Sequence, residues 1–178
     1  MNEYKILFTG AMGAGKTSAI GAVSETPPVV TDVANNDPSH TKARTTVGLD
    51  FGQFTLENGD RIRLFGTPGQ SRFDFLWKIL SKNALGMVIL ADNSRPDPLA
   101  DLRVFLEGFA DDLAHLPAAI GVGRLAAHPA PSLDDYIDEL ARHALVLPVL
   151  DVDVRRKGDV ILLIDTLLAQ LEAGLPEE

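Results

Sequence analysis

The eight residues from Gly10 to Thr17, Gly-Ala-Met-Gly-Ala-Gly-Lys-Thr, constrain the possible folds of this chain more than any other feature. They satisfy the pattern G-x-x-x-x-G-K-[ST], and they stand between an apolar strand pattern at 2–8 and a helical pattern at 15–23. Glycines let backbone N–H groups turn inward and approach phosphate oxygens, and the following helix adds unpaired N–H groups. The segment therefore predicts a strand–loop–helix unit that binds a polyphosphate.

Within this loop, two side chains have distinct expected roles. Lys16 is expected to reach the outer phosphates, and the Thr17 hydroxyl can ligate Mg²⁺. The residues expected to contact the nucleotide here belong to the loop and the first helical turn: Gly10, Ala11, Gly13, Ala14, Gly15, Lys16, Thr17 and Ser18. The motif does not indicate which base is bound.

Apolar periodicity along the rest of the chain predicts alternating strands and helices. Thr26 to Thr45 is polar and is expected to be a loop, and Asn58-Gly59 predicts a hairpin. The further expected strands are 47–57, 61–65, 85–91, 118–122 and 145–152, and the expected helices are 98–116, 133–144 (capped by Ser132) and 159–171. This order predicts one domain over residues 1–178, an α/β fold of three α/β/α layers. Its sheet is expected to have about six mostly parallel strands with one antiparallel edge strand.

Two further segments are expected to face the phosphates. Thr46 lies where the long loop enters a strand, and Gly69-Gln70 follows the next strand. A γ-phosphate needs a metal ligand and a backbone donor, which Thr46 and Gly69 can supply, while Gln70 could orient a water for attack. Arg44 and Arg72 are candidates for an internal arginine finger, and solvated surface positions are the alternative for both.

The role of one aromatic pair stays open at this point. Phe73 and Trp77 could form a partner surface, but their spacing with Leu76 and Leu80 fits helix-core packing equally well.

Composition excludes several classes of function. The chain has no cysteine, which excludes disulfides and thiolate chemistry and favours a reducing cytoplasm. The formal net charge of −9 disfavours nucleic-acid binding, and Arg155-Arg156-Lys157 is the only basic run. No apolar stretch approaches the roughly 20 residues that span a bilayer, and no lipidation motif is present, so we expect no direct membrane anchor.

The motifs resemble those of the Ras-like small GTPases. The phosphate loop, Thr46-Val47-Gly48 and Thr67-Pro68-Gly69-Gln70 carry the resemblance, and Leu76-Trp77 is similar to the Arf branch. The segment 64–70 with Arg72-Phe73 looks closer still to predicted prokaryotic GTPases, which include the bacterial gliding-motility (Mgl) type. The specific motifs lie within residues 10–92 of a resemblance that covers roughly 3–170.

The resemblance implies a P-loop NTPase fold of the G-domain type and a molecular switch that binds GTP or GDP with Mg²⁺ and hydrolyses GTP slowly. It implies that Thr17 and Thr46 bind Mg²⁺, that Gly69 senses the γ-phosphate and that Gln70 positions the water. It also implies protein partners, commonly small Roadblock-type regulators or scaffolds.

The chain departs from the family pattern at two places. Gly66 stands where many such GTPases carry an aspartate that helps to hold Mg²⁺, so weaker metal binding is expected. Gly123-Arg124-Leu125-Ala126 replaces the base-reading Asn-Lys-x-Asp, with Arg124 as a candidate nucleotide contact. The counterpart of the third base-contact loop is Asp153-Val154-Arg155, and Asp153 and Val154 are candidate contacts. Loss of the carboxylate should cost about 1.5–3 kcal/mol, or one to two powers of ten in guanine discrimination.

Three functions remain in competition on the sequence alone. The first is a nucleotide-hydrolysing switch, and the second is a pseudo-GTPase scaffold with weak or no nucleotide selectivity. The third, a small P-loop kinase, would need an arginine-rich lid, yet 98–116 holds only Arg103.

Overall fold

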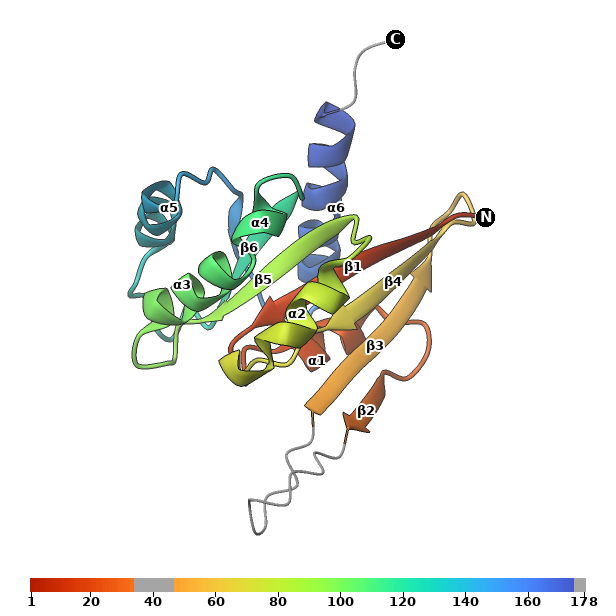
Figure 1. The fold of residues 1–178 in the computed structure, drawn as a ribbon, viewed down its shortest axis with the longest axis horizontal. Helices are drawn as coiled ribbons and strands as arrows, with labels where there is room; N and C mark the ends of the chain where they lie inside the picture. Colours follow the sequence, from red (N-terminus) through yellow and green to blue (C-terminus); the bar gives the residue numbers. More distant parts are fainter. Residues whose placement is uncertain (34–46, 175–178) are drawn as a thin grey trace.

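Seven strands form one sheet within residues 1–33 and 47–174, the residues that the computed structural model describes. The order across the sheet is β2-β3-β4-β1-β5-β6-β7 (Figure 1). The strands are β1 (Glu3–Gly10), β2 (Val29–Val33), β3 (Val47–Thr55), β4 (Arg61–Gly66), β5 (Gly86–Asp92), β6 (Ala118–Gly123) and β7 (Val149–Asp151). The α/β class that the alternation predicted is confirmed.

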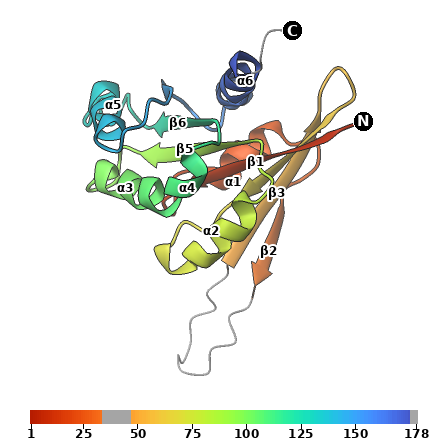
Figure 2. The ribbon, with the colours of Figure 1, turned by 45° about the horizontal axis from the view of Figure 1, so that its top comes forward.

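Helices cover both faces of this sheet (Figure 2). On one face α1 (Lys16–Val23) and α6 (Lys157–Ala173) pack in a single apolar cluster with the strands. The other face carries α2 (Asp74–Ser81), α3 (Pro98–Gly108), the short α4 (Ala110–Leu113) and α5 (Leu133–Arg142), with a 3₁₀ turn, η1 (Ser71–Phe73), before α2. None of the described helices is both long and apolar enough to cross a membrane.

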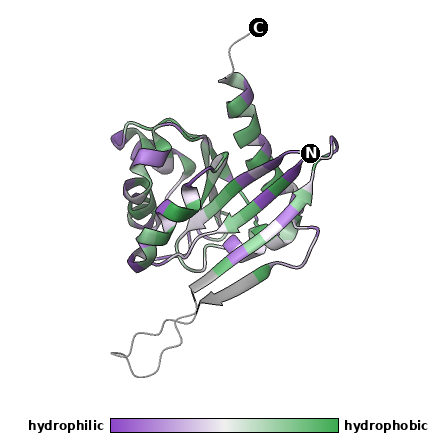
Figure 3. Ribbon diagram, turned by 45° about the vertical axis from the view of Figure 1, so that its right-hand side comes forward, coloured by the Kyte–Doolittle hydropathy of each residue, from purple (hydrophilic) through white to green (hydrophobic). Residues whose placement is uncertain are grey.

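The central strands are apolar on both sides because both sides are covered. All seven residues of β5 are buried, and on β1 the side chains of Ile6 and Phe8 join one cluster while Leu7 joins the other. Figure 3 shows hydrophobic residues along these strands and on much of α6. Two clusters, one on each face, therefore hold the sheet as the middle layer.

The edge of the sheet differs from the prediction. β3 is antiparallel to both of its neighbours, β4 and β2, while the other described pairs are parallel. The prediction of a loop over Thr26–Thr45 is wrong for Val29–Val33, which form β2 outside β3. The antiparallel strand β3 is thus second from the edge. Without β2, one side of β3 would have unpaired N–H and C=O groups, and even a short segment can form hydrogen bonds with them.

Two other elements are shorter than their patterns suggested. The helix expected over Pro98–Leu116 is broken at Phe109, whose backbone angles of φ −107° and ψ 19° separate α3 from α4. The strand expected over Leu145–Val152 pairs only over β7, which begins after Pro148, a residue with no N–H to donate. The predicted cap of α5 is confirmed: the Ser132 hydroxyl accepts a bond from the Asp135 N–H.

Trp77 anchors α2 to the sheet side of α3. Its side chain is 1% exposed, its ring stacks on Phe105 and Phe109 at centroid distances of 4.8 and 5.2 Å, and its Nε1–H donates to the Pro68 carbonyl at 2.9 Å. A Cβ on Gly108 would lie 2.6 Å from Trp77 Cζ3, so the ring fills the space that a side chain there would need. Trp77 and Phe73 are both buried, which decides for core packing over a partner surface.

Replacing Trp77 with alanine should lower the free energy of unfolding by about 3–5 kcal/mol, because it empties a large packed volume. The matched control is Phe75→Ala on the same helix, where the side chain is 58% exposed and the expected change is within about 0.5 kcal/mol. Urea denaturation of the two variants measures the difference. Equal losses would contradict this account of the core.

Candidate nucleotide-binding site

The loop between β1 and α1 forms the floor of a cavity of about 1090 Å³ at the carboxyl ends of the strands. Gly15 precedes α1 with φ 102°, a left-handed value, and a Cβ there would lie 2.6 Å from Val154 Cγ2. Among the described residues no side chain caps this helix. Its first N–H groups are therefore available to an anion, which the helix dipole also favours.

Lys16 lies across the loop, with its ammonium group near the loop's own backbone. Lys16 Nζ donates to the carbonyl oxygens of Gly10 at 2.7 Å and Ala11 at 2.8 Å. Burial lowers the pKa of Lys16 to about 8, the negative charge of Asp50 raises it in part, and the positive charge of Arg95 lowers it. A bound phosphate would supply the negative charge that this buried ammonium lacks.

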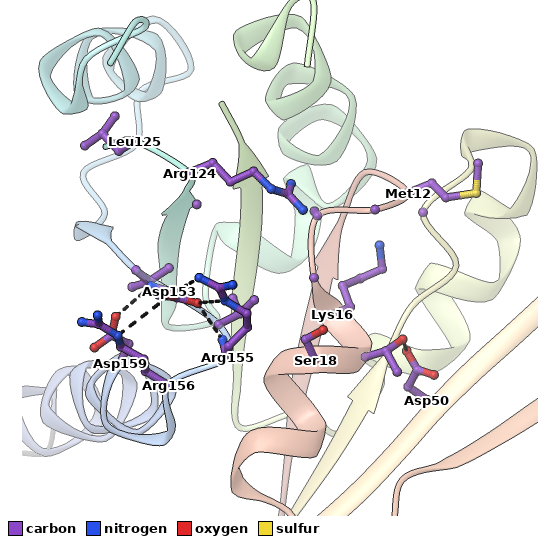
Figure 4. A pocket seen from close by; sticks show the side chains of 18 of the residues that line it. Met12, Lys16, Ser18, Asp50, Arg124, Leu125, Asp153, Arg155, Arg156 and Asp159 are labelled. Atoms are coloured by element: carbon purple, nitrogen blue, oxygen red, sulfur yellow. Dashed lines mark hydrogen bonds and ion pairs between the residues drawn. The ribbon is translucent and has the colours of Figure 1, made fainter. Parts of the chain in front are cut away.

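Thr17, at the second position of α1, meets a carboxylate from the neighbouring strand β3. Its Oγ1 donates to Asp50 Oδ2 at 2.5 Å, and Asp50 is 8% exposed. In Figure 4 Asp50 lies beside the start of α1, on the same side of the cavity as Lys16. A hydroxyl and a carboxylate in contact are both hard oxygen ligands of the kind that Mg²⁺ prefers.

The segment after β4 lies directly over the phosphate loop. Thr67 is fastened to β1 by its N–H, which donates to Phe8 O at 2.9 Å, and by a 2.6 Å hydroxyl contact with Thr9. A Cβ on Gly69 would lie 2.5 Å from Met12 N, so glycine permits this close approach of two backbones. Gln70 Nε2 donates to Met12 Sδ at 3.5 Å. This segment can therefore contact whatever the loop holds.

The base side of the cavity contains the replaced motif. Gly123, Arg124, Leu125 and Ala126 all line it, and Arg124, with φ 63°, forms an ion pair with the buried Asp92. Burial opposes the charge of Asp92, but hydrogen bonds from Ser94 and Arg124 outweigh that effect and lower its pKa. Figure 4 shows the Arg124 side chain extending across the cavity toward the phosphate loop. It lies where it can contact a nucleotide, while Leu125 and Ala126 offer no hydrogen-bonding side chain.

The loop after β7 closes the same side. Asp153 and Val154 line the cavity, and the Asp153 carboxylate binds Arg155 through bonds of 2.9 and 2.7 Å, which hold its pKa well below the usual range. The Asp153 N–H donates to Asp159 Oδ2 at 2.7 Å. The basic run that begins at Arg155 is thus partly neutralised within the chain.

The structure brings most of the predicted residues to one cavity and leaves some elsewhere. Its lining includes Gly13, Ala14, Gly15, Lys16, Thr17, Ser18, Gly69, Gln70, Arg124, Asp153 and Val154. Gly10 and Ala11 are not among these lining residues, and their carbonyl oxygens accept hydrogen bonds from Lys16. Arg72 stacks on Phe73, 4.7 Å from the ring centroid, and lines a smaller neighbouring cavity. Arg44 and Thr46 lie outside the described residues, so the roles predicted for them stay predictions.

The oxygen donors at this end of the cavity fit Mg²⁺. Within the described part of the chain, no group of three or more His, Cys, Asp or Glu side chains could hold a metal ion alone. Mg²⁺ usually takes one or two protein oxygens together with phosphates and water, and Thr17 beside Asp50 provides that donor set.

The comparisons with known proteins agree with this geometry. No protein-family model matches the chain. It is 30% identical to the Ras-related protein Rab-32 of Sus scrofa over 64% of this chain and 47% of that protein, and 29% identical to Rab-8A of Gallus gallus over 56% and 44%. The chain thus spans about half the length of these curated relatives.

A solved structure shares the fold across almost the whole chain. The G domain of the T. maritima FeoB iron transporter superposes with a TM-score of 0.62 over 96% of this chain and 99% of that one, at 18% identity. In sequence the chain is similar to Ras-related small GTPases, and in fold it is similar to a G domain. These similarities do not distinguish the branches of the small GTPases, and the resemblance to the gliding-motility type remains a prediction.

Sequence reasoning missed two contributors to this site. Asp50, Gly52 and Phe54 are alternate residues of β3, so their side chains point to the same face of the sheet, the one that packs on α1. This alternation could have indicated that Asp50 lies near the phosphate loop. Arg95 lies near the loop, with Nη1 3.5 Å from the Met12 carbonyl, and pairs with Asp101. Nothing in the local sequence around Arg95 indicates that contact.

The lowered pKa of Lys16 predicts a pH dependence for phosphate binding. Below about pH 8 the ammonium is already charged, whereas above it binding must take up a proton, because the phosphate raises the pKa of the bound form. The affinity for a fluorescent diphosphate nucleotide should therefore fall by up to roughly tenfold between about pH 8 and pH 9. Lys16→Arg, charged throughout, is the matched control and should show a flatter profile. Equal slopes would contradict this role.

Proposed function

We propose that this protein is a small GTPase-like switch that binds a nucleoside triphosphate with Mg²⁺, with GTP as the first candidate, and hydrolyses it slowly. One observation carries the proposal. The cavity brings together a helix N-terminus, the ammonium of Lys16, the hydroxyl of Thr17 and the backbone of Gly69. A chain of phosphoryl groups is the ligand whose charge and oxygen spacing match these four groups.

The groups divide the work along the phosphate chain. The N–H groups at the start of α1 and Lys16 would neutralise phosphate oxygens, while Thr17 would help to hold Mg²⁺, which would supply further positive charge to the phosphates. The Gly69 N–H, on a segment that lies against the loop, would contact a γ-phosphate when one is present. Loss of that phosphate would remove the contact, which is the physical basis of a switch.

Hydrolysis would depend on Gln70. Its side chain contacts the Met12 sulfur at the rim of the cavity, an exposed position from which rotation can bring the amide toward an attacking water. A reaction that relies on positioning by one amide, with no arginine supplied by a partner, is slow in this class of chemistry.

Replacing Lys16 with alanine should abolish nucleotide binding, because the variant loses the only side-chain cation of the predicted loop motif. Titration calorimetry with GTP, GDP and ATP measures the effect, and Lys78→Ala on the exposed side of α2 is the matched control with unchanged affinity. If the unaltered protein binds none of the three nucleotides near millimolar concentration, the proposed function is wrong.

The base site predicts weak discrimination between purines. Position 126 carries no carboxylate to bind the guanine edge. The ratio of GTP affinity to ATP affinity should therefore be roughly ten to a hundred times lower than in a protein with an aspartate there. Ala126→Asp should raise the preference for GTP about tenfold, because a charge-assisted hydrogen bond to the guanine edge becomes available. Ala110→Asp, on the exposed start of α4, is the charge-matched control. An unchanged GTP-to-ATP affinity ratio in Ala126→Asp would contradict this assignment of the base side.

A second function, a pseudo-GTPase scaffold, is favoured by one observation. Leu125 and Ala126, which line the base side, are apolar, and the nearby Asp153 carboxylate is already bound by Arg155. A scaffold would hold its protein partner equally well with and without nucleotide. Pull-down under both conditions separates the functions, since a switch should bind its partner mainly in the triphosphate state.

We propose a Roadblock-type regulator as the class of partner, on the resemblance to prokaryotic small GTPases. The exposed apolar side chains of Phe75 and Ile79 on α2, shortly after Gly69-Gln70, support a contact surface beside the nucleotide-sensing segment. Charge reversal at Lys78, which lies between them, should weaken that contact if the surface is used.

A further inference from the structure

A buried carboxylate stands next to Gly66, the position where the family pattern has an aspartate and this chain has none. Asp50 on β3 is 8% exposed, and an ionised carboxylate out of water is costly unless a partner or a metal compensates for it. Its Oδ2 accepts the Thr17 hydroxyl bond at 2.5 Å, and its charge reaches Lys16, whose pKa it raises against the effect of burial. Asp50 thus belongs to the phosphate end of the cavity, which it also lines.

Strand register places Asp50 and Gly66 side by side. The two residues are direct partners in the antiparallel ladder of β3 and β4, so side chains at these positions point to the same face of the sheet. A Cβ on Gly66 would lie 3.1 Å from Asp50 Cβ, 3.3 Å from Asp50 Oδ2 and 3.3 Å from Ile20 Cδ1. An aspartate at 66 would therefore compete with Asp50 for one space, and two like charges would meet there.

In the hydrogen bond between Thr17 and Asp50, Thr17 is the donor, which is the direction that a metal site requires. A threonine hydroxyl has one proton and two lone pairs. By accepting the hydrogen bond from the Thr17 hydroxyl, Asp50 leaves the lone pairs of Thr17 available to a cation, and the rest of its carboxylate remains an acceptor for water. An acceptor that orients a ligand in this way commonly contributes 10–100-fold to metal affinity.

We propose that Asp50 replaces the aspartate missing at Gly66: from the neighbouring strand, it orients Thr17 and accepts hydrogen bonds from the water shell of the nucleotide-bound Mg²⁺. Gly66 leaves the room that this carboxylate needs. The carboxylate that supports the metal thus lies on β3 instead of the neighbouring β4. Metal binding is therefore not weakened as the absence of an aspartate at Gly66 alone would suggest. The inference rests on the proposed nucleotide-binding function.

The test compares metal dependence rather than turnover. Dissociation constants for a fluorescent GDP analogue are measured in excess Mg²⁺ and in EDTA, and Mn²⁺ affinity of the protein–GDP complex is measured by electron paramagnetic resonance. In Asp50→Asn the Mn²⁺ affinity should fall about 10–100-fold and the Mg²⁺ enhancement of GDP binding should shrink accordingly. The affinity in EDTA should change by less than about threefold.

A residue exchange separates a metal role from a structural one. Asp50→Gly/Gly66→Asp moves the carboxylate to the paired position and removes the Cβ that would crowd it, so it should recover most of the Mn²⁺ affinity. A carboxylate that only fastens β3 to α1 would not be rescued in this way. Asp111→Asn, an exposed change of equal charge, is the control and should match the unaltered protein.

The outcomes are distinguishable. If the unaltered protein binds GDP but Asp50→Asn keeps its full Mn²⁺ affinity, the inference is wrong and the nucleotide site stands. If Asp50→Asn loses metal affinity and the exchange variant, folded by circular dichroism, regains none, the orienting role is also overturned. Failure of the unaltered protein to bind GDP in either buffer would refute both the inference and the proposed function.

Discussion

The ammonium of Lys16, held against the carbonyl oxygens of its own loop, is the interaction around which the rest of the site is arranged. The hydrogen-bond acceptors of this buried cation are neutral and do not balance its charge, and burial lowers the pKa of Lys16 to about 8. The loop can hold it there because β1 runs between β4 and β5 in the middle of the sheet, where the ends of the strands are fixed. The cavity is therefore prepared for an anion before one arrives.

An anion site also limits how many carboxylates can lie at the phosphate end, because each one would repel a bound phosphate. Asp50 partly compensates the charge of Lys16 and accepts a hydrogen bond from the Thr17 hydroxyl, while Gly66 opposite it has no side chain. A second carboxylate on the paired strand would add repulsion where phosphates must also fit. Farther away, Asp92 and Asp153 are each paired with an arginine, so these two carboxylates leave little net charge free. The fold thus accommodates a strongly acidic chain around an anion site.

The features that could be predicted from the sequence are those that depend on residues close together in the chain. The phosphate loop, the apolar strands β1 and β5 and the Ser132 cap were predictable, because strand period, glycine conformation and capping act within a few residues. β2 was not, since Val29–Val33 carries no alternation of its own and becomes a strand only by pairing with β3. The break at Phe109 and the burial of Trp77 likewise depend on α2 and α3 packing together.

By itself the sequence determined the class of fold and the presence of a phosphate-binding loop, since the spacing of Gly10, Gly15 and Lys16 restricts the backbone to few conformations. Only the tertiary structure decided which groups join that loop. Asp50 and Gly66 are 16 positions apart along the chain (66 minus 50), and it is the register of two antiparallel strands that makes them neighbours. For a related reason Arg124 reaches the cavity from the end of β6, and Arg95, beyond the end of β5, reaches the Met12 carbonyl of the phosphate loop. Parallel strands bring distant segments to one edge, and no local pattern records which side chains meet there.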